Sequence, residues 1–316
     1  MVNNRELPPI NASPVRGRDS TISTFVFPSQ YLLINSPPSS YNCINMILKS
    51  FERTGMLILG WLKILSDGAK ILGETLYWIF IAPFRLEPHR RKAIDWKAVF
   101  EQMVFMGYDS VLIVFFVTFF TGIVLAMQSA HQLERMGGVI YVASLVTISL
   151  CRELGPVLTA LVIAGRVGAS ITAEIASMQV NEQIEALDTM AISPVRYLVV
   201  PKLIALVLML PLLSVVGDAF GILGGYMIGV YNLHINSGLY LQIAFKFLTL
   251  KDVYTGLSKA FVFAMIITLV GAYQGLKTQG GAVGVGRSTT KSVVMSFILV
   301  ILADCVITGI YFFTGN

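Results

Sequence analysis

Ionisable side chains are scarce in this chain: only 13% of its 316 residues are charged, whereas 55% are hydrophobic. Soluble domains carry about a quarter charged residues, so this composition excludes an ordinary soluble protein and indicates an integral membrane protein. Lysine and arginine together outnumber the acidic residues by 23 to 18. In a membrane protein such an excess is typical of cytoplasmic loops, and we therefore expect no nucleic-acid partner.

Cysteine and histidine are equally scarce. The chain has three of each, all far apart in the sequence: Cys43, Cys151 and Cys305, and His89, His131 and His234. No C-x-x-C spacing and no histidine cluster occurs, so the sequence predicts neither a disulfide framework nor a metal site. The cysteines are expected to be small apolar residues of helices.

The sequence also lacks a complete nucleotide-binding motif. The stretch GGAVGVGRSTTK at 280–291 is glycine-rich, but a Walker motif needs G-K-[ST] after a buried strand. Here Gly286-Arg287-Ser288 stands within a predicted short basic loop at 277–291. No Walker B pattern, nucleophile elbow or kinase signature occurs elsewhere. We therefore expect no enzyme activity and no cofactor for this chain alone.

The N-terminal third lacks an uninterrupted apolar run. Residues 1–43 are rich in Ser, Pro and Asn and predict a disordered tail, with a weak organelle transit peptide as the alternative and no secretory signal. Between 44 and 97, charged residues interrupt the hydrophobic ones too often for a membrane span. We expect an interfacial amphipathic helix there, anchored by Trp61, Tyr77 and Trp78, and then a basic connector.

Residues 98–316 are predicted to form an all-α transmembrane domain. Five apolar runs can cross a bilayer: 110–128, 139–165, 197–230, 254–276 and 292–313. The run at 197–230 is either one helix kinked at Pro211 or two short spans. The basic segments fall on one side of the membrane only if it is one helix, which gives five spans with the N-terminus inside and the C-terminus outside.

A polar segment separates the second and third spans. Residues 169–190 lack proline and repeat apolar residues at helical intervals, while Glu174, Glu182, Glu185 and Asp188 occupy much of the remaining surface. Ser193-Pro194 ends this pattern. The segment predicts a helix lying at the membrane surface, a position suited to receive force from outside the bilayer.

Five charged residues lie in or near apolar spans: Arg152, Glu153, Asp218, Lys259 and Asp304. Two hypotheses are equally favoured: the charges line a polar cavity that gates or binds a headgroup, or they form structural ion pairs. Glu153 with Lys259 and Arg152 with Asp304 is one pairing among several.

Small residues recur along the third span at Gly217, Gly221, Gly224, Gly225 and Gly229. Gly221-x-x-x-Gly225 and Gly225-x-x-x-Gly229 permit close helix approach. The spacing fits a homodimer seam or packing within one chain.

The stretch RELGPVLTALVIAGRVGASITAEIASMQVNEQIEAL, followed by DTMAISPVRYLVVPKLIA, resembles the MlaE family, the permease subunits of MCE-associated ABC lipid transporters. The resemblance extends from about residue 46 to the C-terminus and includes SKAFVFA and VGRSTTKSVV. It implies a homodimer, a cytoplasmic ABC ATPase that binds the ATP, an MCE-domain protein on the far side, and a phospholipid or glycolipid substrate. It also implies a bacterial or cyanobacterial inner membrane, or a plastid inner envelope.

The resemblance further assigns roles to residues. The helix at 169–190 would be the cytoplasmic coupling helix, seated in the ATPase through Glu174, Glu182, Gln183 and Glu185. A lipid cavity between two permeases would be lined at the end of the first span, with two charges nearby. The residues at these positions are Leu125, Gln128, Gln132, Leu133 and Met136, with Arg152 and Glu153. Gln132 and Met136 depart from the apolar or aromatic residues usual in the family.

Two other functions are compatible with the charges and spans. A proton-coupled secondary transporter would relay protons through Glu153, Lys259 and Asp304. Such carriers often contain repeated halves, and no repeat links the first and last spans. A membrane anchor for an MCE protein is the third possibility, with purely structural charges.

Overall fold

The computed structural model describes residues 66, 68, 70, 71, 73–75, 77, 78 and 95–314. The predicted tail at 1–43 lies outside these residues, as do Trp61 and most of the predicted interfacial helix at 44–97. The described residues form helices and turns and contain no strand, which confirms the all-α fold.

Five stretches of the described chain are long and apolar enough to cross a membrane, as predicted. The first joins α3 (Trp96–Met106), η3 (Tyr108–Ser110) and α4 (Val111–Glu134). The second joins η4 (Val139–Tyr141), α5 (Val142–Ser149), η5 (Leu150–Leu154), α6 (Gly155–Ile163), η6 (Ala164–Gly168) and α7 (Ala169–Val180). The third joins η7 (Val195–Val199) to α9 (Val200–Tyr231), and the last two are α11 (Leu250–Leu276) and α12 (Gly281–Phe313).

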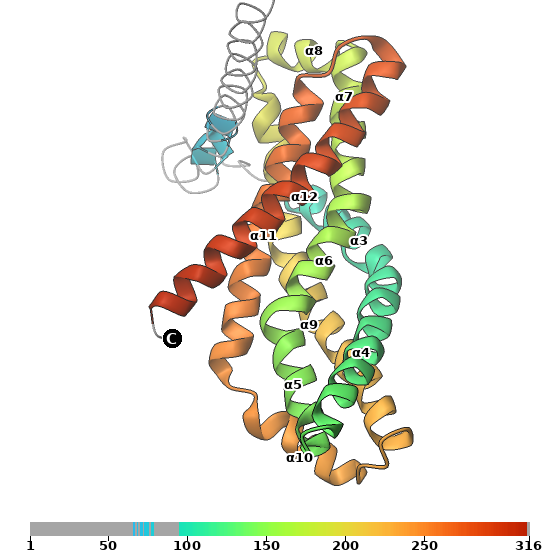
Figure 1. Cartoon of the computed structure of the whole chain (residues 1–316). Helices are drawn as coiled ribbons and strands as arrows, with labels where there is room; N and C mark the ends of the chain where they lie inside the picture. The colour runs from blue at the N-terminus through green and yellow to red at the C-terminus, as the bar shows by residue number, and fades with distance from the viewer. Residues whose placement is uncertain are drawn as a thin grey trace, which may run out of the picture. The chain divides into compact units, whose positions relative to one another are not determined.

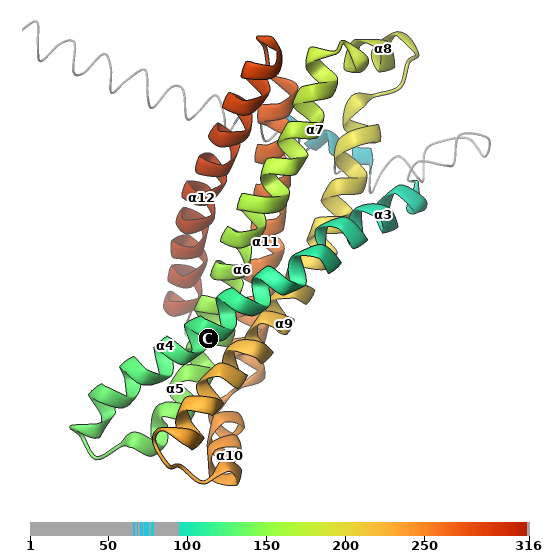
Figure 2. The ribbon, with the colours of Figure 1, turned by 90° about the vertical axis from the view of Figure 1, so that its right-hand side faces the viewer.

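Two short helices mark the opposite ends of this bundle. Figures 1 and 2 show α8 (Gln183–Thr189) across one end and α10 (Ser237–Phe247) at the other, and we call these the α8 end and the α10 end. The helix α9 runs from one end to the other without a break, although it contains Pro211. The single-helix alternative for the third span is therefore correct.

The predicted surface helix at 169–190 is wrong in its extent. Its first half, α7, continues the second span, because Ile171, Thr172, Ile175 and Ala176 are buried against the bundle. The helix ends at Asn181, and Glu182 adopts a left-handed backbone with φ 57°. Only α8, after this break, lies across the end of the bundle (Figure 2).

The connections between the last three spans are also more helical than predicted. The basic stretch at 277–291 is a loop only to Gly280, whose left-handed backbone (φ 92°) precedes the start of α12. The glycine-rich segment is therefore helical and follows no strand, unlike a phosphate-binding loop. The segment between the third and fourth predicted spans contains α10, which Asn236 caps by accepting hydrogen bonds from two backbone N–H groups.

Prolines explain two wide turns within the long helices. Both η5 and η7 are π-helical, with Gly155 N–H donating to Leu150 O and Val200 N–H donating to Val195 O. The next residue in each case is a proline, Pro156 or Pro201, which has no N–H to continue the α-helical ladder. A π-turn lets the helix continue past the missing donor with a local bend.

The glycines of α9 pack within the chain. A Cβ on Gly221 would stand 2.9 Å from a methyl group of Leu150, and one on Gly122 of α4 would stand 1.9 Å from Gly221 O. A Cβ on Gly224 would meet Phe119 O of α4 at 2.3 Å. These glycines therefore bring α4 and α9 together in one chain, as the intramolecular alternative predicted.

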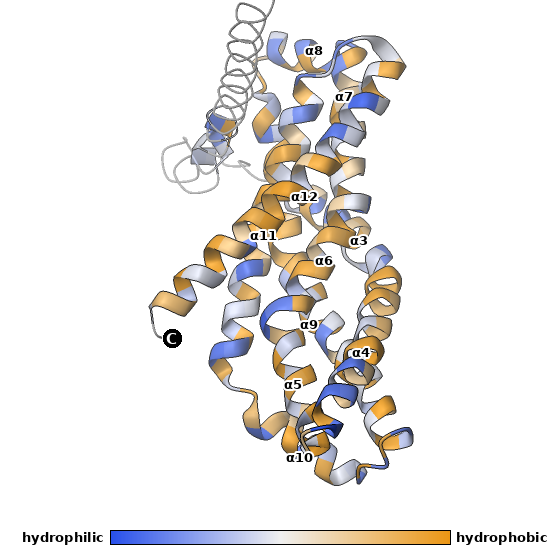
Figure 3. Cartoon of the chain, in the orientation of Figure 1, coloured by the Kyte–Doolittle hydropathy of each residue, from blue (hydrophilic) through white to orange (hydrophobic). Residues whose placement is uncertain are grey.

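The helices differ in how much of their apolar surface is covered. Half of the most apolar stretch of α11 is buried, because α11 packs against α6, α7, α9 and α12. Only 17% of the corresponding stretch of α12 is buried. Figure 3 shows hydrophobic residues along much of α4 and α12, and these faces are available to lipid or to another chain.

Candidate functional site

The most concentrated polar chemistry inside the bundle surrounds η5, the turn that carries Arg152 and Glu153. The carbonyl of Cys151 in this π-helical turn faces Gly256 of α11. A Cβ on Gly256 would stand only 2.1 Å from Cys151 O. The absence of a side chain at this position allows α11 to approach η5 closely, which places Lys259 beside Glu153.

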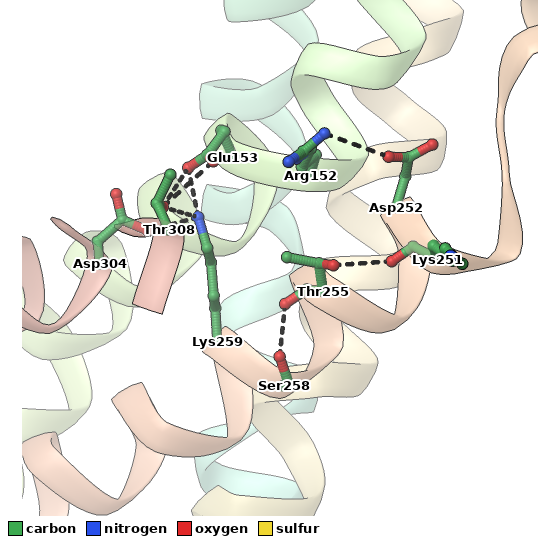
Figure 4. A network of polar contacts seen from close by, with 9 residues as sticks. All are labelled: Arg152, Glu153, Lys251, Asp252, Thr255, Ser258, Lys259, Asp304 and Thr308. Carbon is green, nitrogen blue, oxygen red and sulfur yellow. Dashed lines mark hydrogen bonds and ion pairs between the residues drawn. The ribbon is translucent and has the colours of Figure 1, made fainter. Parts of the chain in front are cut away.

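Lys259 is the centre of a three-helix ionic contact (Figure 4). Its side chain is fully buried, and its Nζ donates to a Glu153 carboxylate oxygen and, at 2.7 Å, to Thr308 Oγ1 of α12. Asp304 Oδ1 lies 2.8 Å from the same Nζ, as an ionic contact outside aligned hydrogen-bond geometry. Thr308 donates onward to Glu153 Oε1 at 3.2 Å. We call Glu153, Lys259, Asp304 and Thr308 the lysine cluster.

Arg152 belongs to a neighbouring pair. Its Nη1 lies 3.8 Å from Asp252 Oδ1, and Asp252 also forms the capping box of α11 with Thr249. Arg152 and Glu153 diverge because adjacent helical residues point about 100° apart, and Figure 4 shows them directed to different partners. The pairing of Glu153 with Lys259 is thus confirmed, and that of Arg152 with Asp304 is wrong.

Asp218 stands apart from both pairs. It lies on α9 against Gly155, where a Cβ would be 1.6 Å from Asp218 Oδ1, and that oxygen has no hydrogen-bond partner among the described residues. Four of the five predicted intramembrane charges therefore lie on η5, α11 and α12 and take part in these two neighbouring contacts, whereas Asp218 lies apart on α9.

The charge balance of the two pairs determines what they can do. Two cations, Arg152 and Lys259, face three carboxylates, those of Glu153, Asp252 and Asp304. A buried ammonium with two carboxylates and a hydroxyl holds three helices in one register, because removing the ammonium would leave two neighbouring carboxylates without a cation. About a third of the Glu153 and Arg152 side chains is exposed. A contact of these two residues with lipid stays a prediction.

The predicted lipid-contacting residues of α4 lie near its end. Gln128, Gln132 and Met136 are exposed. Leu125 and Leu133 are half-buried and pack on a hydrophobic cluster that includes Leu150 and is also flanked by Leu154. This cluster links the end of α4 to the turn that carries Arg152 and Glu153.

The predicted ATPase-coupling residues divide into two groups. Glu182, Gln183 and Glu185 are exposed around the start of α8. Glu174 lies instead on α7, where its Oε2 accepts a hydrogen bond from Lys202 Nζ at 2.6 Å. The structure therefore separates Glu174 from the other three.

Arg166 is a positioning residue that the sequence analysis missed. From the π-turn η6 its Nη1 donates to Phe105 O at 3.2 Å and to Ser110 Oγ, and its Nη2 lies 3.5 Å from Asp109. It thereby fixes the bend between α3 and α4. The sequence feature that could have identified this residue is its place directly after the long apolar run of the second span. Within the described part of the chain, no cluster of His, Cys, Asp and Glu is arranged to hold a metal ion.

Comparison with known proteins gives this architecture a family. Residues 99–310 match the family described as Permease MlaE. The chain belongs to the MlaE permease family. A probable ABC transporter permease protein of Rickettsia typhi is 46% identical over 214 residues, covering 68% of this chain and 83% of the relative. A protein of the same description from Synechocystis is 39% identical over 219 residues, covering 69% and 83%, and one from Pyropia yezoensis is 37% identical over 214 residues, covering 68% and 81%.

The MlaE match contains every predicted site residue, from Leu125 on α4 to Asp304 on α12. With its five apolar helices, the chain is a multi-pass membrane protein and an ABC transporter permease of the MlaE family. A permease of this class is a transport subunit, so the membership implies an ATPase partner.

Proposed function

We propose that this MlaE permease moves phospholipid or glycolipid between membranes as a homodimer. A cytoplasmic ABC ATPase supplies the energy at the α8 end, and an MCE-domain protein continues the lipid path at the α10 end. The observation that carries the proposal is the uncovered apolar face of α12, which borders the lysine cluster. This face consists of Val294, Ile298, Ile301, Leu302, Val306 and Ile310.

The second span suits the transmission of force from the ATPase. It is one helix from Val139 to Val180, so a single element joins the α8 end of the bundle to η5 in its middle, and α8 follows this element directly after the break at Glu182. When the ATPases close, the two α8 helices of a dimer move together. The π-turns η6 and η5 are the places where the displaced helix bends, since their ladders are already irregular.

The lysine cluster couples that bend to α11 and α12. Because Lys259 contacts Glu153 and Asp304 at once, a shift of η5 moves α12 or breaks a buried ion pair. The apolar faces of α4 and α12 then form a cavity for acyl chains in one state and close it in the other. The lipid moves because the two states differ in affinity for it.

A vesicle transfer assay tests the proposal. The permease is reconstituted with its ATPase and MCE partners, and fluorescent phospholipid is followed to acceptor vesicles. We expect transfer that requires ATP and stops with a hydrolysis-deficient ATPase. Transfer driven by a proton gradient without ATP would instead establish the secondary transporter. ATP turnover that ignores added lipid, without transfer, would favour the anchor.

A further inference from the structure

A polar cavity lies towards the α8 end, and its lining shares no residue with the lysine cluster. It has a volume of about 680 Å³ and is lined by the start of α3, by α7, and by the junction of η7 with α9. Three cationic side chains line it, Lys97, Arg196 and Lys202, against two carboxylates, Asp95 and Glu174. None of the residues predicted to contact transported lipid is among its lining.

Lys202 is the unusual member of this lining. Its side chain is only 3% exposed, yet its single hydrogen bond among the described residues goes to Glu174, whose side chain is 48% exposed. An ammonium group has three donors, and one acceptor leaves two of them without a partner among the described residues. An anion that enters the cavity would accept from these donors and would compete with Glu174 for the ammonium.

The other charged groups favour an anion as that acceptor. Asp95 is already engaged as the cap of α3, where its Oδ1 accepts from Lys97 N at 3.1 Å. The Lys97 ammonium is well exposed at the rim, 3.9 Å from Glu101 Oε1, and the Arg196 guanidinium stacks over the Trp78 ring at 4.9 Å. Among the residues that line the cavity, three cationic side chains accompany two carboxylates, and a phosphate group in the cavity would accept from Lys202.

The surroundings of the cavity are those of a membrane interface. Trp96 and Tyr197 line it and are each 59% exposed, as aromatic residues at headgroup depth commonly are. Along α3 the exposed side chains continue as Phe100 and Val104, at successive four-residue steps. A ligand with a phosphate in the cavity would thus find an apolar stripe for its chains beside it.

We propose that this cavity binds the headgroup phosphate of an anionic phospholipid from the leaflet nearest the α8 end. The site is separate from the transport path. Gly107 approaches Met209 and Gly122 approaches Gly221, so α9 and the first span run side by side in the same direction. At 1.5 Å per residue, the α9 residues opposite Leu125 lie about 35 Å beyond Lys202.

Binding at this site has a consequence for coupling. The lipid phosphate competes with Glu174 for Lys202, and Glu174 lies on the last turns of α7 before the break into α8. Occupancy therefore releases a carboxylate beside the segment that faces the ATPase. Anionic lipid acts here as a regulator, whichever lipid is transported.

Tryptophan quenching tests the site in the full chain. Replacing Trp61 and Trp78 by Phe leaves Trp96, at the rim, as the sole tryptophan and keeps an aromatic ring beneath Arg196. The protein is reconstituted in phosphatidylcholine vesicles containing either brominated phosphatidylglycerol or brominated phosphatidylcholine. We expect the anionic lipid to quench Trp96 with roughly fivefold preference, the effect of one cationic side chain near an anionic surface. Equal quenching by both lipids would overturn the proposal.

Three variants separate binding from a structural role. Lys202→Gln should abolish the preference, and Lys97→Gln, at an exposed position where folding is not at risk, should reduce it. Glu174→Gln removes the competing carboxylate and should raise the preference for the anionic lipid. A loss of the preference in this variant would mean that the pair of Lys202 and Glu174 only stabilises the fold. Lys246→Gln, in α10 at the opposite end, is the matched control and should change nothing.

Inorganic phosphate distinguishes a lipid from a soluble anion. At constant ionic strength, an excess of inorganic phosphate should leave the preference for phosphatidylglycerol intact, because free phosphate gains nothing from the apolar stripe. Loss of the preference on adding phosphate would assign the cavity to a soluble anion and overturn the lipid proposal. These experiments measure lipid binding, so a failure of the proposal for this cavity is distinguishable from a failure of the proposed lipid transport.

Discussion

At the scale of single residues, the distinctive feature of this permease is a lysine without any exposure, held between two carboxylates. Lys259 joins Glu153 of η5 and Asp304 of α12. An ammonium group is costly to bury in a membrane span, and the carboxylates of Glu153 and Asp304 reduce that cost. Substitutions here therefore act through the charges that they leave behind.

Lys259→Ala should lower the free energy of unfolding by up to about 3–5 kcal/mol, because it leaves the half-buried carboxylates of Glu153 and Asp304 without a cation. Thermal unfolding in mild detergent measures this. The triple variant Lys259→Met, Glu153→Gln, Asp304→Asn carries no net charge at the cluster and should recover most of the loss. Equal instability of the single and triple variants would contradict the ionic account.

The contact of Gly122 with Gly221 makes a second residue-scale prediction. Gly122→Val should separate α4 from α9 and destabilise the chain by at least about 1–3 kcal/mol, since a Cβ has no room there. Gly309→Val on α12 is a matched control with open space around the added atoms. Melting temperature and yield report both variants, and similar losses would show that the close approach is not what matters.

At the scale of elements, the short α8 carries the predicted coupling role. Glu182→Arg should leave the fold intact, because arginine is no more strained than glutamate in the left-handed backbone conformation of this position. It should reduce recovery of the ATPase by up to roughly fivefold through reversal of one exposed charge. The measurement is copurification with tagged permease. Glu134→Arg, exposed at the α10 end, is the control, and equal recovery with both would remove α8 from the interface.

The end of α4 is the element assigned to transported lipid. Leu125→Arg should eliminate most copurified lipid, because a charge at membrane depth costs about 2.5–3.5 kcal/mol and would occupy the acyl-chain surface. Leu125→Met keeps the volume and apolarity of the side chain and should retain lipid. Lipid content by mass spectrometry compares them, and unchanged lipid with arginine would exclude this surface from the transport path.

The elements also show how far prediction from sequence reaches. Hydrophobic length and the distribution of basic residues sufficed for five spans, including the unbroken α9. The division of 169–190 into α7 and α8 did not follow, because it depends on a left-handed Glu182 that no periodicity encodes. The π-turns follow from Pro156 and Pro201 only once the helices are seen to continue past them.

The same division holds for the candidate site. Charged residues in apolar runs identified Glu153, Lys259 and Asp304 as candidates and suggested the pairing of Glu153 with Lys259, whereas Asp304 was paired with Arg152 instead of Lys259. The partners Asp252 of Arg152 and Lys202 of Glu174 were missed, because Asp252 and Lys202 lie near the starts of their spans, where a charge is ordinary. Their pairing depends on the bends at η5 and η7, which sequence spacing does not fix.

At the scale of the whole molecule, one continuous helix connects the α8 end to the lysine cluster, and that cluster connects it to the uncovered face of α12. The described part of the chain has an acidic surface around α8 and uncovered apolar faces along α4 and α12. The ATPase covers the first in our account, and lipid and a second copy of the chain cover the others.

The most direct test of this account is the composition of the complex isolated from its native membrane. Tagged permease is purified in mild detergent, and the copurifying proteins and lipids are identified and counted by mass spectrometry. The account predicts two permease copies with an ABC ATPase, an MCE-domain protein and stoichiometric phospholipid or glycolipid. A single homogeneous protein without an ATPase or bound lipid would contradict it.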